Sequence, residues 1–179
     1  MTTANKLTIF RVLLIPVFLL LAYAGRMGWA LAVFVIASLT DMLDGYIARH
    51  YNQITDFGKF MDPLADKVLV MAAMCYFVQA GRMPGWALAI VLLREFAVSG
   101  MRLVAVEQGR VIAAAWSGKI KTGATMVCLC LMLLIGPPDP WDSAPDLIAQ
   151  LSTAVILLTT VYSGVEYFWK NRDVFKHVD

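Results

Sequence analysis

Six long apolar segments follow one another along this chain of 179 residues. They lie at 8–25, 28–48, 61–80, 85–106, 115–135 and 147–168. Crossing a bilayer core about 30 Å thick takes roughly 20 mostly apolar helical residues, so each segment predicts a membrane-spanning helix. Of all residues 60% are hydrophobic and 16% are charged, against about 45–50% and 25% in soluble domains. We therefore expect an all-α polytopic membrane protein, with six transmembrane helices in one bundle and a single domain over residues 1–179.

Lysine and arginine residues are unevenly divided between the two ends of the predicted helices. Eleven of the 15 lie in the terminal segments or around the second and fourth connections, whereas Arg26 and Arg82 lie on the opposite side. Because cytoplasmic segments carry the excess of basic residues, both termini should be cytoplasmic. The net charge of +2 is too small to indicate binding of nucleic acid.

Four carboxylates gather where the second predicted helix gives way to the third. Asp41 and Asp44 are spaced i, i+3, and Asp62 and Asp66 are spaced i, i+4, so on helices each pair projects from one face. Four acids this close need a compensating charge, because their repulsion otherwise disrupts the fold. Carboxylates without His or Cys suit hard divalent cations such as Mg²⁺, which commonly also bind phosphate oxygens. We therefore predict one or two divalent cations and a phosphate-ester substrate that arrives from the cytoplasm, with Asp66 best placed as a general base.

Residues around these acids have a functional and a plain interpretation. Gly45 allows close approach of a ligand, or of another helix at a crossing. Arg49 could neutralise phosphate oxygens or pair with an aspartate. Asp56 fits neither spacing, and we interpret it as a solvated loop residue.

Two arginines, Arg94 and Arg102, lie within the fourth apolar segment. A charge at such a depth costs about 2.5–3.5 kcal/mol and normally faces the bundle interior with a partner, for which Glu95 and Glu107 are candidates. The two arginines are eight residues apart and can share a helix face, which favours an anion-binding site over a purely structural ion pair. The same basic series continues with Arg110, Lys119 and Lys121.

The spacing Asp-x2-Asp-Gly-x2-Ala-Arg-x8-Gly-x3-Asp-x3-Asp runs without departure from Asp41 to Asp66. With this pattern the chain resembles the CDP-alcohol phosphotransferases. Residues 5–11, 94–102 and 117–122 are most similar to the bacterial phosphatidylglycerophosphate synthase branch of that family. The resemblance implies a phospholipid-synthesising membrane enzyme that transfers the phosphatidyl group from CDP-diacylglycerol to glycerol 3-phosphate and releases CMP.

The resemblance also implies roles for individual residues. Two divalent cations, Mg²⁺ or Mn²⁺, would be held by the four motif aspartates, of which Asp66 would also be the catalytic base. The residues expected to bind CDP-diacylglycerol are Asn5, Thr8, Arg11, Asp41, Asp44, Gly45, Arg49, Thr55, Gly58 and Asp62. The residues expected to bind glycerol 3-phosphate are Arg94, Arg102, Arg110, Lys119 and Lys121.

Two alternatives remain at this point. Within the family, phosphatidylinositol phosphate synthase also needs positive charge for a phosphorylated acceptor. Outside it, a small cation or proton transporter could use intramembrane acids, although these acids lie near one face only. Family membership further implies a homodimer in the bacterial inner membrane, with the active site facing the cytoplasm.

Overall fold

The computed structural model describes residues 3–50, 56–110, 112–113, 115–135 and 147–177, with side chains described for 9–40, 67–110, 112–113, 115–135 and 147–174. Within these residues the chain forms six α-helices and a short 3-10 helix, and no strand. They are α1 (Thr3–Tyr23), α2 (Met27–His50), α3 (Asp56–Gln79), α4 (Gly85–Glu107), α5 (Trp116–Leu134), α6 (Leu147–Lys170) and η1 (Arg172–His177). The predicted all-α class is confirmed.

Each α-helix matches one predicted apolar segment to within five residues at either end. Helix α1 begins five residues earlier than predicted, at Thr3, and the start of α3 differs by as much. Hydropathy alone places that start at 61, because the preceding residues of the aspartate motif are polar. The structure begins α3 at Asp56, so the interpretation of Asp56 as a loop residue is wrong. An acid in the first turn of a helix is favoured by the helix dipole. The short helix η1 was not among the predicted elements.

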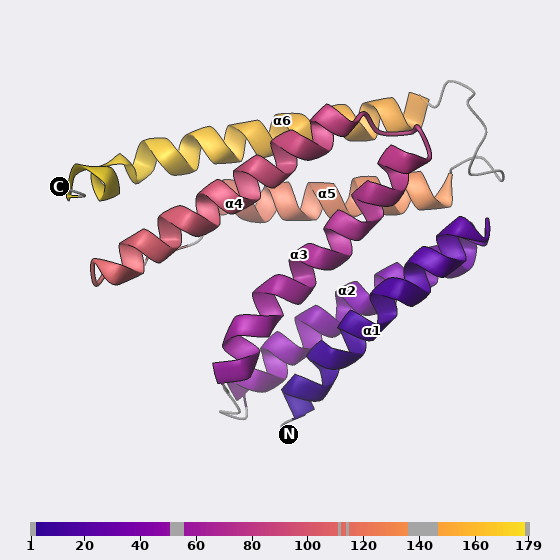
Figure 1. Cartoon of the computed structure of the whole chain (residues 1–179), viewed down its shortest axis with the longest axis horizontal. Coiled ribbons are helices and arrows are strands. Elements are labelled where there is room, and N and C mark those ends of the chain that lie inside the picture. The colour runs from indigo at the N-terminus through magenta and orange to yellow at the C-terminus, as the bar shows by residue number, and fades with distance from the viewer. Residues whose placement is uncertain (1–2, 51–55, 111, 114, 136–146, 178–179) are drawn as a thin grey trace.

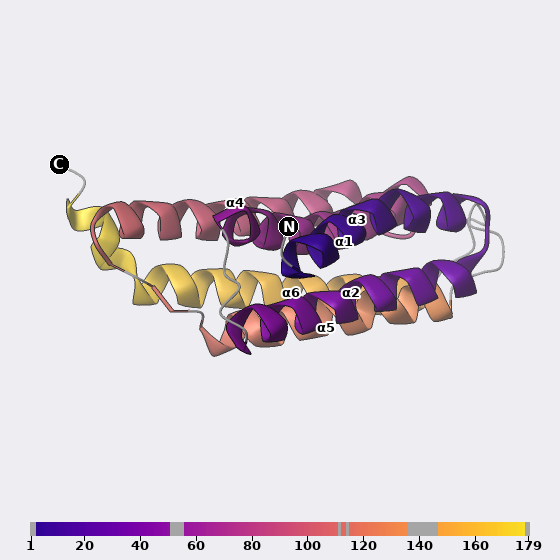
Figure 2. The same cartoon turned by 90° about the horizontal axis from the view of Figure 1, so that it is seen from below.

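The six helices form two layers of three (Figure 2). One layer contains α1, α3 and α4, and the other contains α2, α5 and α6. The most extensive helix–helix contacts are those of α1 with α2 and of α5 with α6. Helices run alternately up and down, so the start of α1, the end of α2, the start of α3 and the end of α6 lie on one side of the bundle (Figure 1). This arrangement puts both termini on the side where the aspartate motif lies.

Glycines with positive φ make the sharp turns on the opposite side. Gly25 has φ 72° and Gly81 has φ 70°, a conformation that costs residues with a Cβ more than it costs glycine. After Gly25 the amide of Arg26 donates to Leu21 O at 2.9 Å, and after Gly81 the amide of Arg82 donates to Phe77 O at 2.9 Å. Both helices thus end in the glycine C-cap that satisfies their last carbonyls.

Large apolar side chains face both inward and outward on this bundle. Phe18, Phe34 and Ile156 are fully buried in the main core. Leu20 on α1 and Leu158 on α6, by contrast, are 71% and 72% exposed. Exposed large apolar residues also occur on α2, α3, α4 and α5. Monomeric soluble proteins rarely expose so much apolar surface, which indicates an apolar surrounding.

Among the described helices, α5 and α6 are long and apolar enough to cross a membrane by length and composition. Shorter apolar runs occupy Ile9–Tyr23, Met27–Thr40 and Lys67–Gln79. Helix α4 carries Arg94, Glu95 and Arg102 within its middle turns. These interior charges are the starting point for the site.

Candidate active site

All four motif aspartates lie in helical backbone. Asp41 and Asp44 occupy the last turns of α2, and Asp62 and Asp66 lie in the first half of α3. These two helices contact each other and are joined on the side of the bundle that holds the N-terminus (Figure 1). The spacings therefore fall on helices, as the sequence analysis requires. The side chains of residues 41–50 and 56–66 are outside the described set, so their ligand roles stay predictions.

The predicted CDP-diacylglycerol residues are distributed around this same end. Asn5 and Thr8 lie in the first turns of α1, and Gly45 and Arg49 lie in α2. Gly58 lies in α3, and Thr55 is outside the described residues. Arg11 on α1 is fully buried, unusually for an arginine. Its guanidinium thus lies inside the bundle, and its role in binding CDP-diacylglycerol stays a prediction.

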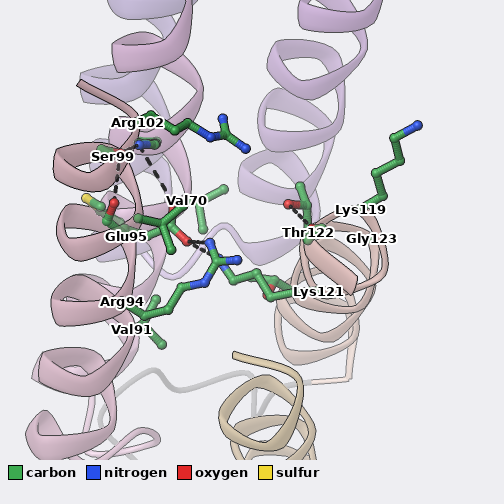
Figure 3. Close-up of a pocket in the computed structure, with 15 residues that line it drawn as sticks. Val70, Val91, Arg94, Glu95, Ser99, Arg102, Lys119, Lys121, Thr122 and Gly123 are labelled. Atoms are coloured by element: carbon green, nitrogen blue, oxygen red, sulfur yellow. Dashed lines mark hydrogen bonds and ion pairs between the residues drawn. The ribbon is translucent and has the colours of Figure 1, made fainter. Parts of the chain in front are cut away.

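A cavity of about 470 Å³ lies between α3, α4 and α5. Of the described residues, five cationic side chains line it together with one carboxylate, so these six groups carry a formal charge of +4. These groups are Lys67, Arg94, Arg102, Lys119, Lys121 and Glu95. Figure 3 shows Arg94 and Lys121 directed toward each other across the cavity, whereas Lys119 points away from them. Such a lining suits a small anion that carries more than one negative charge.

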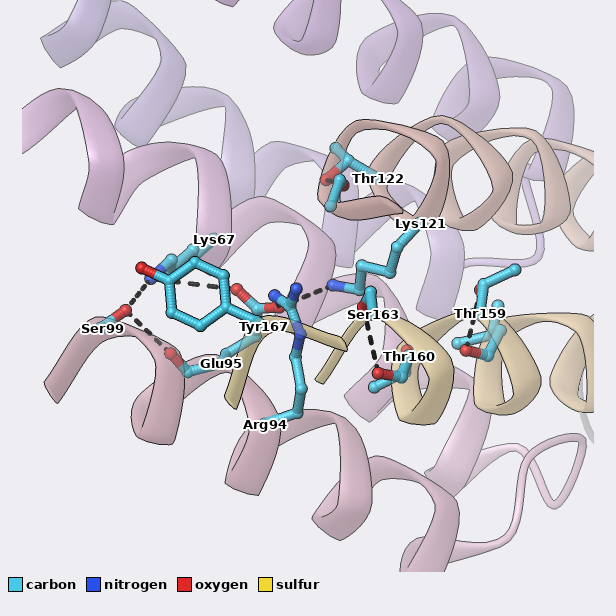
Figure 4. A network of polar contacts seen from close by, with 12 residues as sticks. Lys67, Arg94, Glu95, Ser99, Lys121, Thr122, Thr159, Thr160, Ser163 and Tyr167 are labelled. Atoms are coloured by element: carbon cyan, nitrogen blue, oxygen red, sulfur yellow. Dashed lines mark hydrogen bonds and ion pairs between the residues drawn. The ribbon is translucent and has the colours of Figure 1, made fainter. Parts of the chain in front are cut away.

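Glu95 is paired with three of these cations. Its Oε1 lies 2.8 Å from Arg94 Nη1 and 2.7 Å from Lys121 Nζ. Its Oε2 lies 3.9 Å from Lys67 Nζ. Lys67 Nζ also donates to Ser99 Oγ at 2.5 Å, and Ser99 Oγ donates to the backbone oxygen of Glu95 at 2.8 Å. Figure 4 shows this network joining α3, α4 and α5.

The side chain of Arg94 passes close to two glycines on neighbouring helices. A Cβ added to Gly164 of α6 would lie 3.1 Å from Arg94 Cγ, and one added to Gly118 of α5 would lie 3.8 Å from an Arg94 guanidinium nitrogen. Gly164 therefore leaves room for the arginine stem. Two buried polar atoms of cavity-lining residues, Arg94 Nε and Thr125 Oγ1, have no hydrogen-bond partner among the described residues. Buried polar atoms normally have a partner, so an oxygen-rich ligand or water is the expected occupant.

The other two cations are held by aromatic side chains. Arg102 Nε donates to Tyr167 Oη at 3.2 Å, and its guanidinium lies 5.6 Å from the centre of the same ring. Lys119 Nζ lies 5.0 Å from the ring centre of Trp116. Both contacts are within the range of cation–π attraction.

The structure brings together four of the five residues predicted to bind the acceptor. Arg94, Arg102, Lys119 and Lys121 line the cavity, whereas Arg110 follows the end of α4, is exposed and does not line it. The predicted pairing of Arg94 with Glu95 is confirmed.

Sequence reasoning missed two contributors to the cavity. Ser99 was not singled out as a ligand-site residue, and Lys67 was interpreted as a topology signal. The position of Lys67 directly after Asp66 is the signal that could have placed it near the motif. No group of three or more His, Cys, Asp or Glu side chains suited to a metal occurs where side chains are described, a set that excludes the aspartate motif.

Comparison with known proteins gives a consistent result. The profile of the CDP-alcohol phosphatidyltransferase family matches residues 1–165. A Bacillus subtilis (strain 168) protein named CDP-diacylglycerol–glycerol-3-phosphate 3-phosphatidyltransferase is 42% identical, over 96% of each chain. An Escherichia coli (strain K12) protein of the same name is 38% identical over 90% of each chain. A Mycobacterium tuberculosis (strain H37Rv) protein named probable phosphatidylglycerophosphate synthase is 37% identical over 92% of this chain and 78% of its own.

Proposed function

The chain belongs to the CDP-alcohol phosphatidyltransferase family, and we propose that it transfers the phosphatidyl group of CDP-diacylglycerol to glycerol 3-phosphate. The products are phosphatidylglycerophosphate and CMP. This is the activity in the names of several relatives at 35–42% identity. It makes the chain an enzyme of phosphatidylglycerol synthesis.

The cavity lining is the observation that carries the choice of acceptor. Glycerol 3-phosphate is dianionic near neutral pH, and the described part of the lining offers a net formal charge of +4 between α3, α4 and α5. Arg94, Lys121 and Lys67 lie within 4 Å of one carboxylate, that of Glu95, so we assign these three clustered cations to the acceptor's phosphate group. Glu95 alone does not balance the cations of this lining, so an acceptor without net charge, such as serine or glycerol, would leave more of their charge uncompensated than glycerol 3-phosphate does. Arg102 and Lys119 would complete the acceptor site, with Arg110 at its approach.

The aspartate motif would supply the reaction centre. We assign Asp41, Asp44, Asp62 and Asp66 to two divalent cations, Mg²⁺ or Mn²⁺, because a set of carboxylate oxygens is the donor set that such hard cations prefer. Bound cations would neutralise the pyrophosphate of the lipid substrate and stabilise the attacking and leaving oxygens. We assign the binding of CDP-diacylglycerol to residues of α1, α2 and α3 and to Thr55. They are Asn5, Thr8, Arg11, Asp41, Asp44, Gly45, Arg49, Thr55, Gly58 and Asp62.

In the proposed reaction the acceptor hydroxyl oxygen attacks the phosphorus that bears the diacylglycerol. The new P–O bond forms as the bond from that phosphorus to the bridging oxygen breaks, and CMP leaves with the bonding electrons. The hydroxyl proton passes to Asp66. Placing acceptor and base on packed helices lowers the entropic cost of the attack.

The membrane arrangement follows from the outer surface of the bundle. We assign all six α-helices to the bacterial inner membrane, since large apolar residues are exposed on each of them while buried polar residues such as Lys121 and Thr160 face inward. The basic residues of the terminal segments put both termini and the active site on the cytoplasmic side. A homodimer is the assembly that we expect, as the family resemblance implies.

Release of CMP tests this function. Purified protein in mixed micelles with CDP-diacylglycerol, glycerol 3-phosphate and Mg²⁺ should release CMP, and EDTA should stop the release until excess Mg²⁺ is added. Asp66→Asn should reduce the rate at least about 100-fold, as expected for loss of a general base. Asp173→Asn in η1, which lies outside the motif, should retain the wild-type rate. A transporter would release no CMP in any of these reactions.

A further inference from the structure

Among the described residues that line the cavity, Glu95 is the single carboxylate. It contacts Arg94 on its own helix, Lys121 on α5 and Lys67 on α3. Its side chain is 14% exposed, and those of Arg94 and Lys121 are 13% and 7% exposed. Three helices thus direct cations at one largely buried acid.

A second connection joins α3 to α4 through Ser99. Ser99, one turn after Glu95, accepts a hydrogen bond from Lys67 and donates one to the Glu95 carbonyl oxygen. Lys67 directly follows Asp66 along α3. Glu95 and Ser99 therefore tie the cations of the cavity to the helix that carries half of the aspartate motif (Figure 4).

The physical consequence concerns the positions of the cations before any acceptor arrives. Arg94 Nη1 and Lys121 Nζ both lie within 2.8 Å of the same oxygen, Glu95 Oε1. Without that oxygen the two cations would repel each other, and the lysine stem has the freedom to swing away. Groups already held in the binding geometry need no reorganisation when the ligand binds, which strengthens binding.

We propose that Glu95 is a positioning residue for the acceptor: its carboxylate holds Lys67, Arg94 and Lys121 in the geometry that receives the phosphate of glycerol 3-phosphate. Glu95 itself touches no reacting atom. The proposal rests on the function proposed above, and it adds a residue that repels the acceptor's charge yet is needed for its binding.

Simple electrostatics predicts the opposite outcome, which makes the proposal testable. Glu95→Gln changes the formal charge of the described cavity lining from +4 to +5. If charge alone set acceptor affinity, this change would lower the KM for glycerol 3-phosphate. If positioning dominates, the released cations move and the KM rises.

The experiment measures CMP release by Glu95→Gln with each substrate varied in turn. The KM for glycerol 3-phosphate should rise about 10-fold or more, in line with the cost of small displacements of binding groups, and the KM for CDP-diacylglycerol should change less than 2-fold. Glu95→Asp keeps the charge but shortens the reach by one methylene group, so its KM for the acceptor should lie between those of Glu95→Gln and the wild type. Glu166→Gln is the matched control, since Glu166 pairs with Lys170 and does not line the cavity. Both of its KM values should be those of the wild type.

The possible results separate the two proposals. A wild-type protein that releases no CMP with glycerol 3-phosphate refutes the proposed function. An active wild type combined with a lowered or unchanged acceptor KM in Glu95→Gln, or with equal rises for both substrates, overturns the positioning role. Should Glu95→Gln fail to fold, Glu95→Asp decides alone, and an acceptor KM equal to that of the wild type would then refute the role.

Discussion

Two lysines on α5, two residues apart, should respond very differently to the same substitution. Lys121 is buried and lies 2.7 Å from Glu95, whereas Lys119 is exposed beside the ring of Trp116. We predict that Lys121→Met raises the KM for glycerol 3-phosphate far more than Lys119→Met does. In both variants methionine keeps the unbranched stem, one atom shorter, and removes the charge.

The magnitude follows from burial. A hydrogen bond to a charged group contributes about 1.5–3 kcal/mol. Losing the proposed hydrogen bond from Lys121 to the acceptor phosphate should therefore raise the acceptor KM about 10- to 150-fold. The fold should survive, because Glu95 keeps Arg94 and Lys67 as partners. The exposed Lys119 is screened by solvent and should contribute at most about 1 kcal/mol, a change below about 5-fold.

Initial rates of CMP release at varied acceptor and fixed lipid measure both effects. The KM for CDP-diacylglycerol, measured in the reverse arrangement, should stay near the wild-type value in both variants. Equal rises in acceptor KM for the two lysines, or a parallel rise in the lipid KM for Lys121→Met, would refute the assignment of Lys121 to the acceptor phosphate.

Two further predictions concern the packing around the site and the opposite end of the bundle. Gly164→Ala should raise the acceptor KM about 2- to 12-fold, because the new Cβ would lie 3.1 Å from Arg94 Cγ and displacing that side chain costs about 0.5–1.5 kcal/mol. Gly100→Ala is the control, since its Cβ would meet nothing within 4 Å. Equal kinetics of the two variants would contradict the argument. Arg82→Leu should lower the free energy of unfolding by about 1–3 kcal/mol without changing either KM, since Arg82 Nη1 donates to the Met132 carbonyl oxygen at 2.9 Å. Thermal unfolding in detergent measures this loss. Arg26→Leu, which replaces an exposed arginine, should not show it.

The helices were largely predictable because hydropathy follows them closely. Gly25 and Gly81 stand at the ends of the first and third apolar segments, and both have positive φ in the structure, since a chain reversal after a helix needs a residue that tolerates it. Hydropathy did not predict helical residues where polar residues of the aspartate motif stand in place of apolar ones. The first turn of α3, which begins at Asp56, is polar because it belongs to the motif, so an apolar window cannot detect it.

The cavity was predictable only in part, for a different physical reason. Arg94 and Arg102 stand out because a charge within an apolar segment demands a partner. Ser99 has no such local signal, and Lys67 has only its position directly after Asp66. The hydrogen bond between them joins α3 to α4, a contact that sequence spacing does not encode. Glu95 was predictable as a partner of Arg94, but its contacts to two other helices depend on the packing of the whole bundle.

Choice of acceptor is the most direct test of the central claim, that the cation-lined cavity receives glycerol 3-phosphate for phosphatidyl transfer. The measurement is a side-by-side assay of CMP and lipid product with glycerol 3-phosphate, inositol phosphate, inositol, serine and glycerol. We predict equal amounts of CMP and phosphatidylglycerophosphate with glycerol 3-phosphate, and little or no turnover with the other four. Faster turnover with inositol phosphate, or turnover with an uncharged acceptor at a comparable rate, would contradict the account.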